Sequence, residues 1–395
     1  MDLDAKIAAA AYYKAGGVSN AGISALLRVD LSSVSRYLKY AEDNDWLAHK
    51  LDLHLPRELE REVLSTVRDV ELEDKLFEFF TTGSGGETAT QVRRQGIVVV
   101  RGELAGPGPT ESVRKPAREV PPSEDLAATM LNIEGARLLV DILAQFERSR
   151  PVVLGVTWGR RTGGVVSFLG DMTLPELPEL RVVALQGGVG RGLAPERGGQ
   201  NYSDVLAERI ATLFRSGQAP ARITLPAFIP SRLARELGDE GLKAIWKFIN
   251  SDQSFQTAAS LHEQLDVGLV GVGGFESGAW AVTSGYLSAA DVKDLKRAGA
   301  VGDIVCRFFR EAGESPIEGW AAASGGGGAI RAANLRAVGV SLATLAARVR
   351  AGARVLAVAG GASGAKALAL RAAVRAGLVS DIVTDSPTCL TIVAS

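Results

Sequence analysis

The chain is poor in the residues that build metal and redox centres. Its 395 residues include two cysteines, Cys306 and Cys389, and three histidines, His49, His54 and His262. Two cysteines cannot form a disulfide framework, and neither lies near a second Cys or a His at the spacing of a zinc site. We therefore expect no metal, two partly buried thiols in a reducing compartment, and histidines at the surface or in loops.

Long hydrophobic runs and an excess of one charge are also missing. No stretch of about 18 apolar residues is present, so we expect no membrane span. The first six residues carry acids where a secretory signal peptide needs a basic region, which predicts a cytoplasmic protein. Lys and Arg number 44 and Asp and Glu number 45. This balance excludes a globally basic nucleic-acid coat but is compatible with a small DNA-binding patch.

What remains is the composition of an ordinary globular protein, with 46% hydrophobic and 23% charged residues. A chain of this length most naturally forms two domains. Short helical patterns fill the first 56 residues. Asn20 is expected to cap the second of these helices and Ser32 the third.

The span 20–41 has the helix-turn-helix spacing of a unit that places its second helix in the DNA major groove. Hydroxyl and guanidinium groups there can bond base edges, and the basic side chains can bond phosphates. The residues expected on this DNA-binding surface are Ser32, Ser33, Ser35, Arg36 and Lys39. A small helical bundle used for protein contact is the alternative that the pattern leaves open.

The first 56 residues are close to neutral, with six Lys or Arg and seven Asp or Glu. A single head of this kind would bind DNA weakly, because few phosphate contacts release few counterions. We therefore expect a homo-oligomer, a dimer or a tetramer, whose linked heads bind a double-stranded DNA operator together.

The residue composition changes twice in the middle of the chain. Residues 57–80 have the pattern of one amphipathic helix, a linker or a dimer contact, and residues 81–125 are rich in Gly and Pro apart from a strand-like run at 96–100. The expected domains are a helix-turn-helix domain over 1–56, a linker helix and irregular segment over 57–125, and an effector-binding α/β domain over 126–395.

After residue 130, apolar runs of strand length alternate with helical patterns. This rhythm predicts a mostly parallel sheet with helices on both faces and a ligand site at the carboxyl ends of the strands. The expected strands are 152–156, 182–185, 223–225, 267–272, 355–359 and 382–383. The expected helices are 132–148, 203–216, 231–250, 255–263, 289–297, 341–350 and 364–376.

The segment 155–162, GVTWGRRT, directly follows one of these strands. Its glycines let the backbone approach an anion, and its threonine hydroxyls, arginines and backbone N–H groups can donate to it. It has neither the GK[ST] of a Walker loop nor a GxGxxG fingerprint, so no nucleotide cofactor is expected. The candidate effector-binding residues are Gly155, Thr157, Gly159, Arg160 and Thr162. A tight connection without a ligand is the alternative.

Further polar residues stand at other strand ends and are expected to hold the body of the ligand. They are Gln186, Gly273, Glu276, Asp303 and Lys366. Taken singly, each has a plain structural role open to it as a turn, cap or solvated residue. A sugar-phosphate isomerase or deaminase with a helical appendage, using Asp266, Glu276 or Asp303 as the base, is the enzymatic alternative. A nucleophilic enzyme has little support, because the sequence lacks a serine elbow and a histidine near the glycine loops.

Together the motifs resemble the SorC family of sugar-responsive bacterial transcription regulators. The segment 32–39, SSVSRYLK, looks like the VSRLLK signature of that family, and GVTWGRRT is similar to its GVSWGRT loop. LVGVGG, GAVGDI, VAGG and VTDSPT follow in the family's order at 269–274, 299–304, 358–361 and 383–388. The resemblance covers 1–56 and about 130–395.

This resemblance implies a DNA-binding head and a large Rossmann-like α/β effector domain, related in fold to sugar-phosphate isomerases and deaminases. It also implies a regulator without enzymatic activity, a tetramer whose operator affinity changes when it binds a phosphorylated sugar. The sequence departs from the family at the second arginine of GRRT, at Arg310, where an Asp is usual, and in the spacing between Gly361 and Lys366. These departures bear on which effector is bound.

Overall fold

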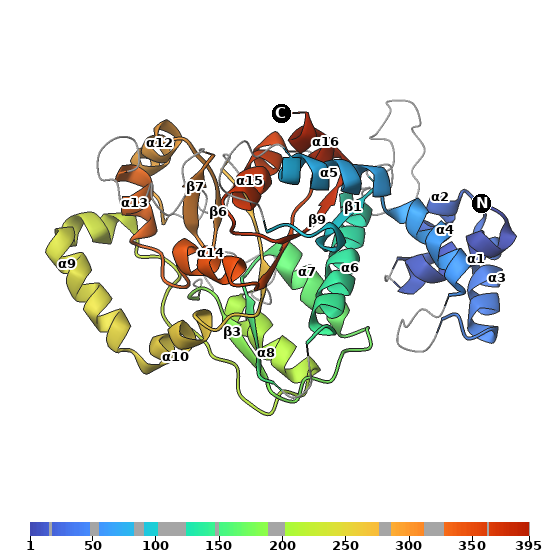
Figure 1. The fold of residues 1–395 in the computed structure, drawn as a ribbon, viewed down its shortest axis with the longest axis horizontal. Helices are drawn as coiled ribbons and strands as arrows, with labels where there is room; N and C mark the ends of the chain where they lie inside the picture. The colour runs from blue at the N-terminus through green and yellow to red at the C-terminus, as the bar shows by residue number, and fades with distance from the viewer. Residues whose placement is uncertain are drawn as a thin grey trace, which may run out of the picture.

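A computed structural model describes residues 1–15, 18–47, 55–82, 91–101, 124–146, 150–188, 202–275, 286–311, 328–361 and 363–394. In these ranges the chain forms a small helical unit at one end and a large α/β unit (Figure 1). None of the helices described there is long and apolar enough to cross a membrane.

The large unit is built on a six-stranded parallel sheet with the strand order β1-β9-β8-β4-β2-β3. The strands are β1 (Ile97–Val100), β2 (Val152–Val156), β3 (Leu180–Ala184), β4 (Val267–Val270), β8 (Arg354–Val358) and β9 (Asp381–Asp385). The predicted parallel sheet is thus confirmed. The expected strand at 223–225 is wrong: this stretch forms no strand, since Pro220 and Pro226 flank it and cannot donate to a ladder.

Helices cover both faces of the sheet, as the continuous apolar strands predict. Alternate strand residues face opposite sides. Val98 accordingly belongs to the hydrophobic cluster that includes α6, α7 and α8, and Val99 to the cluster that includes α5, α14, α15 and α16. The helices of the large unit are α5 (Val70–Thr82), α6 (Glu124–Leu143), α7 (Arg160–Leu169), α8 (Ser203–Leu213), α9 (Ser231–Ser251), α10 (Gln253–His262), α12 (Ala289–Arg297), α13 (Gly328–Asn334), α14 (Leu342–Arg350), α15 (Gly364–Arg375) and α16 (Ser386–Val393).

A second, antiparallel sheet of three strands was not expected from the sequence. It consists of β5 (Gly273–Gly274), β6 (Ala300–Ile304) and β7 (Arg307–Arg310). It packs closely on α15, because a Cβ atom added at Gly302 would overlap the side chain of Ala369. The glycine-rich strands lack the alternation by which such a sheet is usually recognised.

In its described residues the head consists of four helices: α1 (Leu3–Ala15), α2 (Asn20–Leu27), α3 (Leu31–Asp43) and α4 (Arg57–Val67). The alanine-rich helix α1 is buried and contacts the other three. The hydrophobic core of the head continues without a break into the core between α6 and the sheet.

The expected single helix over 57–80 is two helices. Arg68 is extended at φ −105° and bridges Val100, while Asp69 N–H donates to Val99 O at 2.8 Å. The chain between α4 and α5 therefore covers the outer edge of β1, and this pairing interrupts the helix. Because α4 packs in the head and α5 on the sheet, we propose that the head ends after α4.

Candidate functional site

Helix α3, the candidate recognition helix, is capped by Asp30 rather than by Ser32. The Asp30 carboxylate accepts the Ser33 N–H at 2.8 Å, the Ser33 hydroxyl at 2.9 Å and the Ser32 hydroxyl at 2.5 Å. These hydrogen bonds hold the pKa of Asp30 well below its usual range, and the bond from Ser32 has the largest effect. Similarly, Ser19 caps α2 by accepting the Gly22 N–H, so the expected caps were wrong by one and two residues.

The exposed face of α3 carries most of the side chains predicted to reach DNA. Ser32, Ser35, Arg36 and Lys39 are exposed, whereas Ser33 is 7% exposed and is corrected to a buried position. Ser33 supports the surface nonetheless, because its Oγ accepts a hydrogen bond from Arg36 at 3.0 Å. Figure 1 shows α3 at the end of the molecule that lies away from the sheet.

Two further exposed residues of α3 were missed. Leu31 is 54% exposed and Tyr40 is 45% exposed, with the Tyr40 ring edge-on to Trp46. The helical spacing of Ser32, Arg36 and Tyr40, four residues apart, was the signal that could have placed Tyr40 on this face.

The second candidate site lies where the parallel strands end, since parallel strands bring their carboxyl ends to one edge. Thr157 follows β2 and is buried; its Oγ1 accepts the Gly271 N–H at 2.9 Å, and its own N–H donates to Leu269 O at 3.0 Å. Thr157 therefore fastens the end of β2 to the end of β4.

The segment predicted as an anion loop is short, because α7 already begins at Arg160. Gly159 precedes the helix at φ 147° with no side-chain cap, and Thr162 in the first turn donates to Gly159 O at 3.0 Å. Arg160 is exposed and Arg161 is half-buried. Burial lowers the pKa of Arg161 and so does the charge of Arg160, while Asp385 opposes the shift.

Gly155 lies inside the sheet rather than in this loop. A Cβ atom at Gly155 would overlap the side chains of Leu185 and Leu265, so the absence of a side chain permits close packing there.

Gln186 follows β3 and has two buried polar side-chain atoms without hydrogen-bond partners. The residue is 1% exposed, and neither its Oε1 nor its Nε2 has a hydrogen-bond partner. At the start of α8, which packs on β3, the Tyr202 hydroxyl, Ser203 Oγ and Asp204 Oδ1 are also buried without partners. Unpaired buried polar atoms are costly and rare, so these atoms are candidates to bond a ligand.

Residues 202–204 were not singled out from the sequence. They stand at the start of a helix after a strand, the same setting that identified the other strand-end residues, and this setting was the available signal.

The structure also brings three other predicted residues together. Gly273 pairs with Asp303 between β5 and β6, and a Cβ atom on the adjacent Gly274 would overlap the backbone of Ala365 and Lys366. Burial raises the pKa of Asp303 to about 6, although a hydrogen bond from Cys306 N–H opposes the shift. Glu276, the remaining predicted residue, lies outside the described part of the chain.

Asp385, at the end of β9, holds the neighbouring loop in place. Its carboxylate accepts the Gly361 N–H at 2.6 Å and the Thr388 N–H at 2.9 Å, which ties the end of β8 to the start of α16. The same loop leads to Lys366, whose Nζ donates to Gly360 O at 3.4 Å.

Aromatic side chains pack beside the polar atoms. Trp158, Tyr202, Phe275 and Tyr286 belong to one cluster with the buried Phe308. Sugar-sized ligands are commonly held between such apolar walls and a few polar groups.

Asp266, one of the candidate bases, lies apart from the other candidate residues. Asp266 precedes β4, and its carboxylate accepts hydrogen bonds from Arg150 at 3.2 Å and from the Val153 N–H at 2.9 Å. It therefore lies where the parallel strands begin, whereas the other candidates lie where they end. It is therefore corrected from a candidate base to an ion-pair residue. Among the described residues, no group of three His, Cys, Asp or Glu side chains could hold a metal ion.

The sequence of the chain identifies the family to which it belongs. Residues 117–394 match the family model described as "Putative sugar-binding domain", and the chain belongs to that family. A curated relative, the erythritol catabolism regulatory protein EryD of Brucella abortus, is 25% identical over 244 residues. That match spans 62% of this chain and 64% of the relative.

Solved structures share the fold. The full-length sorbitol operon regulator SorC from Klebsiella pneumoniae superposes with a TM-score of 0.53 and 20% identity, covering 99% of this chain and 98% of that one. A domain of a possible sugar-binding transcriptional regulator from Arthrobacter aurescens gives a TM-score of 0.54 and 19% identity, covering 82% of this chain and 97% of that one. The similarity to SorC-type regulators predicted from the motifs is confirmed.

Proposed function

We propose that this chain is a cytoplasmic DNA-binding transcription regulator whose operator affinity is controlled by a sugar or sugar phosphate. The observation that supports this proposal most directly is that one chain contains two separate candidate binding sites. One is the exposed face of α3 with Arg36 and Lys39. The other is the set of four residues after β3 and at the start of α8 whose buried polar atoms lack partners. The family membership and the named regulators support a regulator over an enzyme.

In the effector site, each group has a distinct proposed task. Gln186, Tyr202, Ser203 and Asp204 would bond the hydroxyl groups of the ligand, since they supply donors and acceptors in a buried setting. The start of α7 with Arg160, and Lys366 in the first turn of α15, would attract a phosphate, because a helix N-terminus and cations favour an anion.

A panel of polyols and sugars with and without phosphate tests the ligand class. A ligand that binds the folded chain alone raises its melting temperature by mass action. We expect a member of this panel to raise it, and the chain to leave that compound chemically unchanged. Turnover of a sugar phosphate would favour the isomerase or deaminase alternative, for which Asp303 with its raised pKa would be the base.

One substitution in α3 tests the proposed DNA-binding role. The measured quantity is the affinity for a DNA duplex that the wild-type chain has selected from a pool of random sequences. Arg36→Ala should weaken binding by about 1–3 kcal/mol if it makes a bidentate base contact. The matched control is Arg232→Ala in α9, on the large unit, whose side chain is 91% exposed. Equal affinity of the wild-type chain and Arg36→Ala would remove this residue from the proposed surface.

A further inference from the structure

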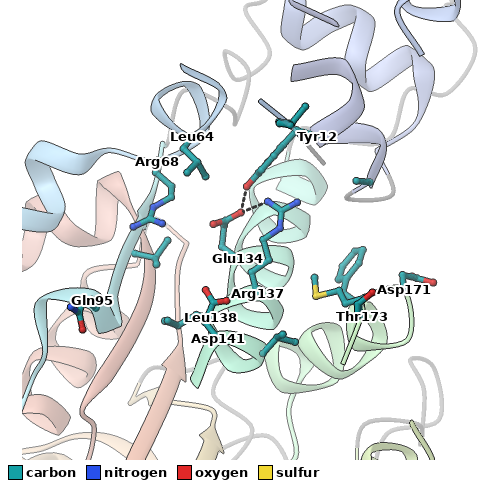
Figure 2. A pocket seen from close by; sticks show the side chains of 16 residues that line it. Tyr12, Leu64, Arg68, Gln95, Glu134, Arg137, Leu138, Asp141, Asp171 and Thr173 are labelled. Carbon is teal, nitrogen blue, oxygen red and sulfur yellow. Dashed lines mark hydrogen bonds and ion pairs between the residues drawn. The ribbon is translucent and has the colours of Figure 1, made fainter. Parts of the chain in front are cut away.

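The head is docked on the large unit through a buried polar contact between α1 and α6 (Figure 2). The Tyr12 hydroxyl donates to Oε1 of Glu134, and Arg137 Nη1 donates to the same oxygen at 3.0 Å. The Arg137 guanidinium also lies over the Tyr12 ring, 3.9 Å from its centroid. Tyr12 and Glu134 are each 3% exposed. We call these three side chains the docking triad.

Each member of the docking triad depends on the other two. A buried carboxylate needs both a charge partner and hydrogen bonds, and removing one of them leaves an uncompensated charge. Burial raises the pKa of Tyr12 well above its ordinary value, with the Glu134 charge adding to the shift, so the phenol stays protonated and remains a donor. The head is thus held in one orientation by a directional contact in addition to apolar packing.

The docking triad borders a cavity of about 350 Å³ between the head and the large unit. Arg68 and Asp141 also line it (Figure 2). Phe168 and Met172 complete its apolar side. This cavity provides room for α6 and the end of α7 to move relative to α1. A tightly packed junction would lack that freedom.

Helix α6 connects the docking triad to the effector site by close packing. A Cβ atom at Gly164 in α7 would overlap the Asn132 side chain of α6, and one at Gly135 in α6 would overlap Val165 and Val358. Asn132 and Gly135 flank Glu134 in the sequence. Gly164 is in the second turn of α7, whose first turn contains Arg160 at the proposed anion site. A displacement of α7 therefore has to be taken up by α6.

We propose that the docking triad is the coupling contact through which the effector site controls the DNA-binding head. The proposal rests on the proposed function and adds a physical route to it. Coupling requires an element with two arrangements that both sites bias. Here a shift of α7 displaces α6 and with it Glu134 and Arg137, which contact Tyr12. The head then either moves together with α6 or loses this contact.

A double-mutant cycle on DNA affinity tests this route without a known effector. Gly164→Ala pushes α7 and α6 apart and replaces the effect of a ligand; Tyr12→Phe removes one hydroxyl from the docking triad. The control is Tyr13→Phe, which changes the neighbouring buried tyrosine whose hydroxyl interacts with Thr66 inside the head. The readout is the dissociation constant for a fluorescent duplex selected by the wild-type chain, with circular dichroism to show that each variant is folded.

We expect Gly164→Ala to change DNA affinity about fivefold or more, the lower range of ordinary allosteric coupling. The same substitution should change it less than about twofold in the Tyr12→Phe background, and should keep its full effect in the Tyr13→Phe background. If Gly164→Ala does not fold, Val165→Ala perturbs the same packing and takes its place.

Two results would overturn the proposal. One is an additive cycle, in which Gly164→Ala acts equally with and without the Tyr12 hydroxyl; the other is a folded Gly164→Ala chain with wild-type DNA affinity. Both leave the proposed function standing, because the wild-type chain still binds DNA. A wild-type chain that retains no duplex at low salt would remove the proposed function and this inference with it.

Discussion

Arg307 shows how much a single buried side chain can organise. Its guanidinium donates to four backbone carbonyls, those of Val340 at 2.9 Å, Asn334 at 2.7 Å, Ala337 at 2.9 Å and Gly339 at 3.2 Å. Burial lowers its pKa to about 10, so it remains charged at neutral pH. Since Gly339 forms a backbone bridge with Gln186, Arg307 helps to hold the backbone next to the proposed effector site.

Replacing Arg307 with Met should lower the free energy of unfolding by about 3–5 kcal/mol, because it leaves buried carbonyls without donors. Urea unfolding monitored by circular dichroism measures the loss. Arg232→Met, at an exposed position of α9, should stay within about 0.5 kcal/mol of the wild-type value. A loss below about 1 kcal/mol for Arg307→Met would show that the four bonds are weak or replaced by water.

His262 was expected at the surface or in a loop; it is instead buried in the last turn of α10, which corrects that expectation. Its Nε2 lies 2.9 Å from Ala184 O, at the end of β3. Burial lowers its pKa to about 4, with a smaller effect of Arg307 in the same direction; the bond to Ala184 and the charge of Glu263 oppose the shift. The sequence around His262 has no signal for this contact, since the partner strand lies 78 residues away.

Stability should therefore depend on pH through His262. Between pH 6.5 and about 4 the unfolded chain binds this proton and the folded chain does not, so the stabilisation is complete above pH 6.5 and is lost as the pH falls towards 4. The loss amounts to about 3 kcal/mol at 1.36 kcal/mol for each pKa unit. In His262→Gln, urea unfolding at pH 7 and pH 4.5 should differ less than in the wild type; an unchanged pH dependence would contradict this assignment.

Replacing Gln186 with an apolar residue should raise the stability of the chain but remove ligand binding. Gln186→Leu removes two buried polar atoms without partners and should raise the free energy of unfolding by about 1–3 kcal/mol. The same change should abolish the rise in melting temperature caused by the binding member of the sugar panel. A less stable variant that still responds to that compound would place the ligand elsewhere.

The junction of α4, α5 and β1 is the clearest case of helices and strands being fixed by contacts distant in sequence. Glu73 is 1% exposed and accepts from Arg68 at 2.8 and 2.9 Å, from Arg94 at 3.3 Å and from the Val99 N–H at 3.2 Å. The sequence predicted a helix here correctly. It could not predict that the helix divides at Arg68, because the division depends on pairing with β1.

Glu73→Gln should destabilise this junction by about 2–4 kcal/mol, since the two arginines lose the charge that they share. Glu71→Gln, on the exposed side of the same helix, should cost less than about 0.5 kcal/mol. Thermal unfolding of both variants gives the comparison. Equal melting temperatures would show that the charge of Glu73 adds nothing beyond its hydrogen bonds.

For the chain as a whole, the strand–helix rhythm predicted the architecture well, because buried parallel strands leave a strong apolar signature. Of the candidate site residues, Thr157 and Gln186 follow strands of the parallel sheet, and Lys366 lies in the first turn of α15. Gly155 lies within β2 and Asp303 within β6, and the binding role of all of them stays a prediction. The unpartnered atoms of Tyr202 to Asp204 could not be predicted, because an unsatisfied group is defined by surroundings that the sequence does not state.

The near neutrality of the head leads to a prediction about assembly. Several heads must act together to reach operator affinity, so the mass in light scattering should be two or four times 41.4 kDa. A particle of 41.4 kDa that binds a specific duplex tightly would contradict this.

One titration decides between a sugar-responsive regulator and the alternatives: the anisotropy of a fluorescent duplex selected by the chain, with and without the binding member of the sugar panel. We predict a dissociation constant of roughly 10⁻⁸ M or tighter that changes at least about fivefold with the ligand. Absence of DNA retention at low salt, together with turnover of a sugar phosphate, would contradict the proposed function.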